Sequence, residues 1–349
     1  MSSSSSSSFP FLQLPFVIQL LILNIFSLYE FLNFSLISPQ TKQLAKHRKV
    51  RFSNLSWTVN DESRDFQLEL RNFFVPFEVF AFRISSRGAI KEPPEYCRIN
   101  GKRVVMATSH HGSNSLWKMG DNQLSSEEGL KLLEELSEHV LDVIQAEQFE
   151  LDWDRWVSLE LADCSLLKHT KTFRRLTVRG WNYSGTKPIN ARNVERILKE
   201  FQIEKFELLC QVEEGFKFSG TLSIEKIRMD DSRWLTSDAL LNMKCREMDI
   251  STRNNLISDE DLNCLVKRWL AGGLENLEKL HINMWPDGSQ ERLDIILKGV
   301  QTFPFDKGNR KRFIERLDLE TGRDMRRRDG RLATAFMNMN ISFYFFVWK

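Results

Sequence analysis

The spacing of apolar positions divides the chain into three stretches. From Pro15 to Lys46, apolar residues recur every three or four positions, as one face of a helix requires. From Val50 to Met106 they alternate with polar residues, which is typical of strands. Beyond Ser125, helical and strand-like patterns take turns. The sequence therefore predicts an α+β or α/β protein with four segments: a serine-rich tail at 1–8, a three-helix unit at 9–48, an antiparallel β section at 49–124 and a strand–helix region at 125–349.

The first apolar stretch permits two interpretations. Residues 9–26 carry no charge, so a membrane anchor or a signal peptide has to be considered. However, no Lys or Arg precedes the stretch, and two prolines and several amide side chains interrupt it. We therefore expect three short helices beginning near Pro15, Phe31 and Thr41. A membrane-anchored or secreted protein remains the alternative, and a glycan on Asn54 or Asn182 would indicate it.

Local signals mark several boundaries further along the chain. Asn100-Gly101 between two apolar runs predicts a tight hairpin. Ser125 with Glu128, and Ser258 with Asp261, predict capping boxes that open amphipathic helices. Two more helices are expected to begin at Asn190 and Ser289, and Gly272-Gly273 predicts a helix end.

Six segments share one form, in which two polar residues follow an apolar one and the apolar–polar alternation then continues. This form is typical of the strand of a leucine-rich repeat and predicts a degenerate curved stack with parallel strands. An ordinary α/β core is the alternative. In a repeat stack the polar strand positions would face away from the helices, on the side where partners bind; we expect Glu207, Asp249, His281 and Asp318 there. The six segments are residues 173–178, 203–208, 224–229, 245–250, 277–282 and 314–319.

Composition and charge reduce the number of function classes that fit this chain. The 49 Lys and Arg residues nearly balance the 47 Asp and Glu residues, and the net charge of +2 argues against a nucleic-acid or membrane-surface partner. Five widely spaced cysteines predict neither a disulfide framework nor a zinc site. They suggest a reducing, intracellular location in the cytoplasm or nucleus, with Cys210, Cys245 and Cys264 as core residues.

Candidate chemistry is sparse. The chain lacks the phosphate-binding, dinucleotide-binding, zinc-protease and serine-hydrolase motifs. His110-His111 is expected in a solvated loop, because adjacent residues of an extended segment point to opposite sides. The tryptophans Trp153, Trp156, Trp181 and Trp234 are expected in the core, or else as exposed anchors for a partner. We therefore expect no enzymatic activity, no cofactor and no metal.

The first helical unit resembles the F-box of the large nematode F-box family. The resemblance is carried by Leu14-Pro15, by residues 28–31 and 33–36, and by residues 38–42. It implies helices whose apolar side chains dock on a Skp-type adaptor that is bound in turn to a cullin. Leu28 departs from the family, which usually has proline there, and Val17 and Leu20 replace charged residues. The implied adaptor-binding residues are Leu14, Pro15, Ile18, Leu21, Ile22, Phe31, Leu32 and Leu36.

The later part of the chain is similar to the type-2 F-box-associated region of the same family. Residues 261–263, 267–270, 272–273, 277–280, 329–334 and 345–348 carry this similarity. Together the two resemblances imply a non-catalytic substrate-recognition subunit of a Skp–cullin–F-box ubiquitin ligase, with an unknown protein target. A protein-binding scaffold that does not engage the adaptor is the alternative.

Overall fold

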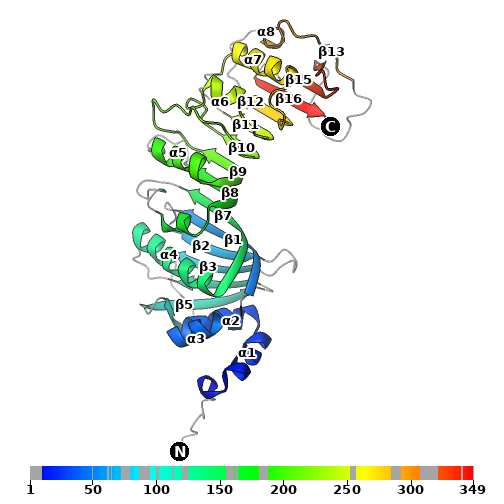
Figure 1. Cartoon of the computed structure of the whole chain (residues 1–349). Coiled ribbons are helices and arrows are strands. Elements are labelled where there is room, and N and C mark those ends of the chain that lie inside the picture. Colours follow the sequence, from blue (N-terminus) through cyan, green and yellow to red (C-terminus); the bar gives the residue numbers. More distant parts are fainter. Residues whose placement is uncertain are drawn as a thin grey trace, which may run out of the picture. The chain divides into compact units, whose positions relative to one another are not determined.

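The structure is a computed structural model that divides into two compact units, Met1–Phe149 and Glu150–Lys349, coloured from blue to red along the chain in Figure 1. Each unit is described by itself. The described residues are 10–48, 50–60, 63, 65–71, 79–85, 95–99, 102–111, 114–119, 125–154, 161, 164–180, 188–251, 257–283, 292–306, 321–338 and 341–348.

The first unit begins with the short helices that the apolar spacing predicts. Ser27 and Glu30 form a capping box at the start of α2, and Ser38 and Thr41 form another at the start of α3. Each box satisfies backbone N–H groups that have no partner inside the helix. The elements are a 3-10 turn at Phe11–Gln13, α1 (Phe16–Ile25), α2 (Leu28–Ile37) and α3 (Pro39–Ala45).

A sheet follows, and its strand order differs from the expected meander. β1, β2 and β3 pair antiparallel in sequence, but β6 lies between β3 and β5 and runs parallel to β3. Alternating polarity defines the two faces of a strand and not its neighbours, so the pattern alone could not reveal this insertion. The strands are β1 (Val50–Asn60), β2 (Asp65–Arg71), β3 (Val79–Ser85), β4 (Glu95–Ile99), β5 (Lys102–His111) and β6 (Asn114–Met119).

Two local predictions for this sheet can be compared with the structure. β4 and β5 pair antiparallel up to Ile99 and Lys102, as a two-residue hairpin requires; Asn100-Gly101 itself lies outside the described residues. The loop expected at His110-His111 is wrong. Both histidines lie at the end of β5 and pair with Ser115 and Asn114 of β6, because hydrogen bonding to a neighbouring strand outweighs local polarity.

Helix α4 (Ser126–Val143) lies on β2 and β3 in the first unit and begins at the predicted Ser125–Glu128 capping box. Gly129 allows close contact, since a Cβ atom at this position would lie 2.3 Å from the Phe66 ring. The buried Trp57 indole donates a hydrogen bond to Ser137 Oγ at 2.8 Å. The core of this unit therefore lies between α4 and the sheet.

The second unit contains the parallel strands that the repeated pattern predicts. From the second half of β7 to β12, each neighbouring pair is parallel. Helices α5, α6 and α7 lie along one side of these strands in Figure 1. The sixth predicted segment, 314–319, lies outside the described residues. The elements are the second half of β7 (Ile144–Asp154), a 3-10 turn at Ser165–Lys168, β8 (Thr172–Arg179), α5 (Ala191–Glu200), β9 (Gln202–Leu209), β10 (Lys226–Met229), α6 (Ser237–Leu241), β11 (Glu247–Ser251), α7 (Asp259–Leu270), β12 (Lys279–Asn283) and α8 (Arg292–Ile296).

Antiparallel strands complete the second unit. The last strand, β16, pairs antiparallel with β12, so the end of the chain extends the parallel sheet. The order continues through β15 and β14 to β13. These strands are β13 (Phe303–Pro304), β14 (Arg323–Arg326), β15 (Leu332–Asn338) and β16 (Ser342–Trp348). The α+β class predicted from the sequence is confirmed.

Burial corrects one expectation and supports another. Cys210 and Cys245 are buried as expected, but Cys264 is exposed, because it faces solvent on α7 while Leu262, Leu265 and Val266 face the core. Trp153 and Trp234 are buried in the second unit. Trp156 and Trp181 lie outside the described residues.

Candidate functional site

Helix α1 exposes a row of large apolar side chains. The exposed fractions are 41% for Ile18, 56% for Leu21 and 81% for Ile25. Phe16 and Val17 are exposed as well, at 50% and 65%. Exposed apolar patches of this kind are common where one protein binds another.

The rest of α1 is held by contacts on its other side. Leu23 is buried with Phe34 of α2 and Leu44 of α3. The buried Gln19 amide donates to the backbone oxygen of Leu14 at 2.9 Å and of Leu12 at 3.1 Å, which fixes the preceding turn against the helix. Gln19, which interrupts the apolar run in the sequence, therefore has a structural role: its hydrogen bonds hold the turn before α1 in place.

The eight residues expected to bind an adaptor separate into two groups. Pro15, Ile18 and Leu21 are exposed, and Leu14 and Ile22 are partly exposed. The other three are buried at 3% exposure or less in this structure, so they belong to the core of the helical unit and not to its surface: Phe31, Leu32 and Leu36.

The sequence prediction also missed part of the exposed row. Phe16, Val17 and Ile25 were not among the expected contact residues, although they are more exposed than Ile18. Helix α1 is apolar on nearly all sides, so three- and four-residue spacing alone cannot tell its buried side from its exposed side. Only the packing of α2 and α3 makes this distinction.

The Leu28 substitution leaves the start of α2 intact. Leu28 is the first residue of this helix, a position that also suits proline. The helix start is held by Ser27 and Glu30, because the Ser27 N–H donates to the Glu30 carboxylate at 2.7 Å. These hydrogen bonds also lower the pKa of Glu30, and burial opposes the shift.

Polar contacts fasten α2 and α3 to α4 within the first unit. His139 of α4 is buried, and its Nε2 lies 3.1 Å from Ser35 Oγ of α2. Asp142 of α4 forms ion pairs with Lys42 at 2.7 Å and with Lys46 at 3.2 Å. Burial, reinforced by the charge of Lys42, lowers the pKa of His139 to about 4; Asp142 opposes this and Lys46 adds to it.

On the second unit, three of the four expected target-binding residues lie in one row across the sheet. Glu207 of β9 pairs in register with Arg228 of β10, which pairs with Asp249 of β11, which pairs with His281 of β12. Their flanking residues Phe206, Leu208, Met248 and Ile250 are buried, so the row projects from the opposite side of the strands. The fourth residue, Asp318, lies outside the described residues.

Two of these carboxylates are held by neighbours in the sheet. Glu207 accepts a hydrogen bond from Thr177 Oγ1 at 3.0 Å and forms an ion pair with Lys205 at 3.0 Å. Asp249 Oδ1 lies 2.8 Å from His281 Nδ1. Burial acts to raise the pKa of each carboxyl group, but these partners outweigh it and lower both pKa values. Both groups are therefore ionised near neutral pH.

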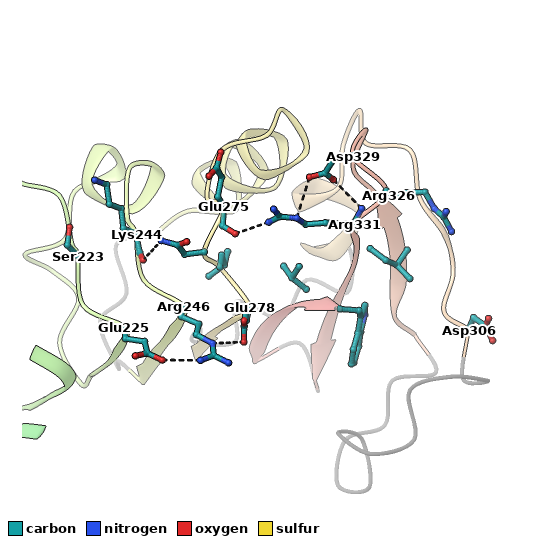
Figure 2. Close-up of a pocket in the computed structure, with 16 residues that line it drawn as sticks. Ser223, Glu225, Lys244, Arg246, Glu275, Glu278, Asp306, Arg326, Asp329 and Arg331 are labelled. Carbon is teal, nitrogen blue, oxygen red and sulfur yellow. Dashed lines mark hydrogen bonds and ion pairs between the residues drawn. The ribbon is translucent and has the colours of Figure 1, made fainter. Parts of the chain in front are cut away.

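A groove lies near the starts of β10, β11 and β12 and has a volume of about 1370 Å³ (Figure 2). Arg246 bridges Glu225 at 3.0 Å and Glu278 at 2.6 Å. At the other side of the groove, Arg331 donates to the backbone oxygen of Glu275 at 2.8 Å and lies 3.3 Å from Asp329. The groove carries both signs of charge, and these pairs hold its walls together.

The described residues contain no cluster of His, Cys, Asp and Glu side chains that could hold a metal ion. Within the same part of the chain, no helix is long and apolar enough to cross a membrane. Asn54, where a glycan would indicate secretion, is only 2% exposed in β1; Asn182 lies outside the described residues.

Comparison with known proteins agrees with the F-box resemblance and with part of the second one, whose segments 329–334 and 345–348 lie outside the matched range. A family model of the F-box domain matches residues 11–53, and one described as F-box associated matches residues 217–282. The first match covers α1, α2 and α3, and the second covers β10, β11 and most of β12 together with α6 and α7.

Two relatives are uncharacterized proteins of Caenorhabditis elegans, F59B2.8 and F59B2.9. They are 26% and 27% identical to this chain over alignments of 167 and 172 positions, which cover 44% and 45% of its length. Each match spans 38% of the relative's own length. No solved structure matches the chain. The chain thus carries an F-box domain followed by an F-box associated region, the domain pair of the nematode family that its sequence resembles.

Proposed function

We propose that this chain is the substrate-recognition subunit of a Skp–cullin–F-box ubiquitin ligase. The apolar row on α1 carries the proposal, since it lies inside the segment that the F-box domain model matches. The Skp-type adaptor binds this row, and the cullin joins through the adaptor. The second unit holds a target protein.

Burial of apolar surface supplies the affinity for the adaptor. Removing one large aliphatic or aromatic side chain from water contributes about 1.5–3 kcal/mol. Ile18 and Leu21 are both more than two fifths exposed, and Phe16, Val17 and Ile25 adjoin them. Docking this helix in a groove of the adaptor therefore stabilises the complex through several side chains at once.

In this role the chain positions the target protein for ubiquitin transfer and supplies no reacting group of its own. A receptor of this kind raises the effective concentration of its target near a separate conjugating enzyme. We place the protein in the cytoplasm or nucleus, where such ligases act. A scaffold that has lost adaptor binding is the second candidate, and the non-proline residue Leu28 is the observation that favours it.

The domain boundaries at residues 48 and 124 belong to this proposal. We assign residues 9–48 to the F-box, 49–124 to a β-rich section and 125–349 to a leucine-rich-repeat-like target-binding region. The parallel pairing from β8 to β12 supports the last assignment. Glu207, Asp249 and His281 then lie on the target side.

The test is co-expression with a Skp-type adaptor, followed by affinity capture and quantification of the complex. The variant is Ile18→Asp combined with Leu21→Asp, which places two charges in the apolar row. Ile295→Asp on α8 is the matched control, because Ile295 is an exposed helical isoleucine in the other unit, at 40% exposure against 41% for Ile18.

We expect the wild type and Ile295→Asp to capture the adaptor equally and the double variant to lose it at least a hundredfold. Circular dichroism checks that each variant is folded. A folded wild type that captures no adaptor would overturn the proposal and favour the scaffold. Equal capture by the double variant would remove α1 as the binding surface.

A further inference from the structure

The row that contains Glu207, Asp249 and His281 ends in aromatic side chains. His281 of β12 pairs in register with Tyr344 of β16, which pairs with Phe336 of β15. The His281 and Tyr344 rings stack with centroids 4.3 Å apart, and the Tyr344 and Phe336 rings stack at 4.7 Å. One line across the strands therefore passes from charged to aromatic side chains.

In the charged part of this row and beside it, two cationic side chains have no ion-pair partner among the described residues. Lys205 pairs with Glu207, and Lys226 pairs with Glu247 at 2.9 Å. Asp249 is engaged by His281. Among the described side chains, Arg228 and Lys279 make no ion pair, and Arg228 is exposed. Both line a hollow of about 190 Å³ on this side of β9, β10, β11 and β12.

The charges around the hollow favour a singly charged anion. Arg228 stands between Glu207 and Asp249 in the row. These carboxylates would repel a doubly charged phosphate more strongly than a carboxylate, whereas a carboxylate can accept the fork of N–H donors that Arg228 offers. The hollow therefore suits an Asp or Glu side chain of a partner protein.

We propose that this row, together with the neighbouring Lys279, binds an extended segment of the target in which a carboxylate contacts Arg228 and Lys279 while an aromatic side chain packs on Tyr344. The inference rests on the proposed function, because it assigns the target-binding surface of the same receptor. Charge complementarity fixes one end of the segment, and apolar contact with the partly exposed Tyr344, whose ring is stacked between His281 and Phe336, fixes the other.

Strand geometry sets the spacing of the two contacts. Arg228 and Tyr344 are three strand spacings apart in the order β10, β11, β12 and β16, which corresponds to roughly 14 Å at about 4.8 Å per spacing. An extended chain advances about 3.4 Å per residue, and every second side chain points to the same side. The acidic and aromatic residues of the target segment should therefore be four positions apart.

The test uses a random-peptide display library selected on the immobilised full chain. We expect enrichment of Asp or Glu four positions from Phe, Tyr or Trp. The most enriched peptide is then synthesised, and its affinity is measured by fluorescence anisotropy for the wild type, for Arg228→Gln combined with Lys279→Gln, and for Tyr344→Ala.

Arg192→Gln on α5 is the matched control, because Arg192 is an exposed arginine on a helix of the same unit. We expect the control to keep the affinity and each of the other two variants to lose about tenfold or more. Thermal unfolding and adaptor capture, which uses the first unit, check that these variants are folded.

Three results would overturn the inference: no enrichment, enrichment without the acidic residue, or binding that the Arg228 and Lys279 substitutions leave unchanged. A version of the peptide with phosphoserine in place of the acidic residue is the last arm. If only this version binds, the row recognises phosphate and the carboxylate assignment is wrong. Adaptor capture fails or succeeds independently of all these results, so the two proposals are tested separately.

Discussion

The exposed row on α1 and the polar row on β9–β12 differ in how many of their side chains already have a suitable partner within the chain. On α1, large apolar side chains are exposed to water, and Ile25 is 81% exposed. On the strands, most charges already have a partner, as with Lys205 and Glu207 or His281 and Asp249. A surface of the first kind gains free energy from being covered, whereas the second offers a few unpaired groups and therefore selects its partner.

The largest effect on this comparison should come from removing a buried side chain of the helical unit. Phe31 is fully buried in α2, and Phe31→Ala should lower the free energy of unfolding by about 3–5 kcal/mol, because it leaves a cavity. Ile25→Ala should change it by less than about 0.5 kcal/mol, since Ile25 is exposed. Urea denaturation measures both. If the two substitutions had equal effects, the separation into buried and surface residues would be wrong.

A smaller effect should come from pH, through the contact between α2 and α4. His139 has a pKa of about 4 in the folded chain, below the ordinary value of 6.5. The unfolded chain therefore binds this proton first, and stability is lost as pH falls from about 6.5 to about 4, by up to about 3 kcal/mol. His139→Gln removes the titrating group and should flatten the decrease.

Urea denaturation of wild type and His139→Gln at several pH values between 7 and 4 measures this effect. Carboxylates that titrate in the same range act in both proteins, so the difference between the two curves isolates His139. Parallel curves would show that burial of this histidine does not contribute to the pH dependence.

The smallest effects are expected on the strand row. Asp249→Ala removes the hydrogen-bond partner of His281 and should lower the free energy of unfolding by about 1 kcal/mol. Glu247→Gln disrupts a partly exposed ion pair with Lys226 and should change the free energy of unfolding by less than about 0.5 kcal/mol. Chemical denaturation compares the two. A larger loss for Glu247→Gln would mean that the exposed pairs stabilise the sheet more than solvent screening allows.

Local sequence determined the elements and several of their boundaries. Ser125 with Glu128 and Ser258 with Asp261 start helices as predicted, because a capping box involves only four consecutive residues. The repeated strand form located β8, β9, β10, β11 and β12 and the row of polar residues on them, because the two-residue period of a strand fixes which side chains share a face. The two resemblances located the F-box and the F-box associated region in the same way, from residues close together in sequence.

Tertiary structure decided what depends on residues far apart in the chain. The insertion of β6 between β3 and β5, the solvent-facing side of α1 and the stacking of His281 on Tyr344 each depend on a neighbour that local pattern does not identify. Periodicity shows that a side chain lies on one face of its element, but only the packed chain shows what covers that face. For this reason the sequence alone predicted Phe31 and Ile18 as equal members of one binding surface, and only the fold placed one in the core and left the other exposed.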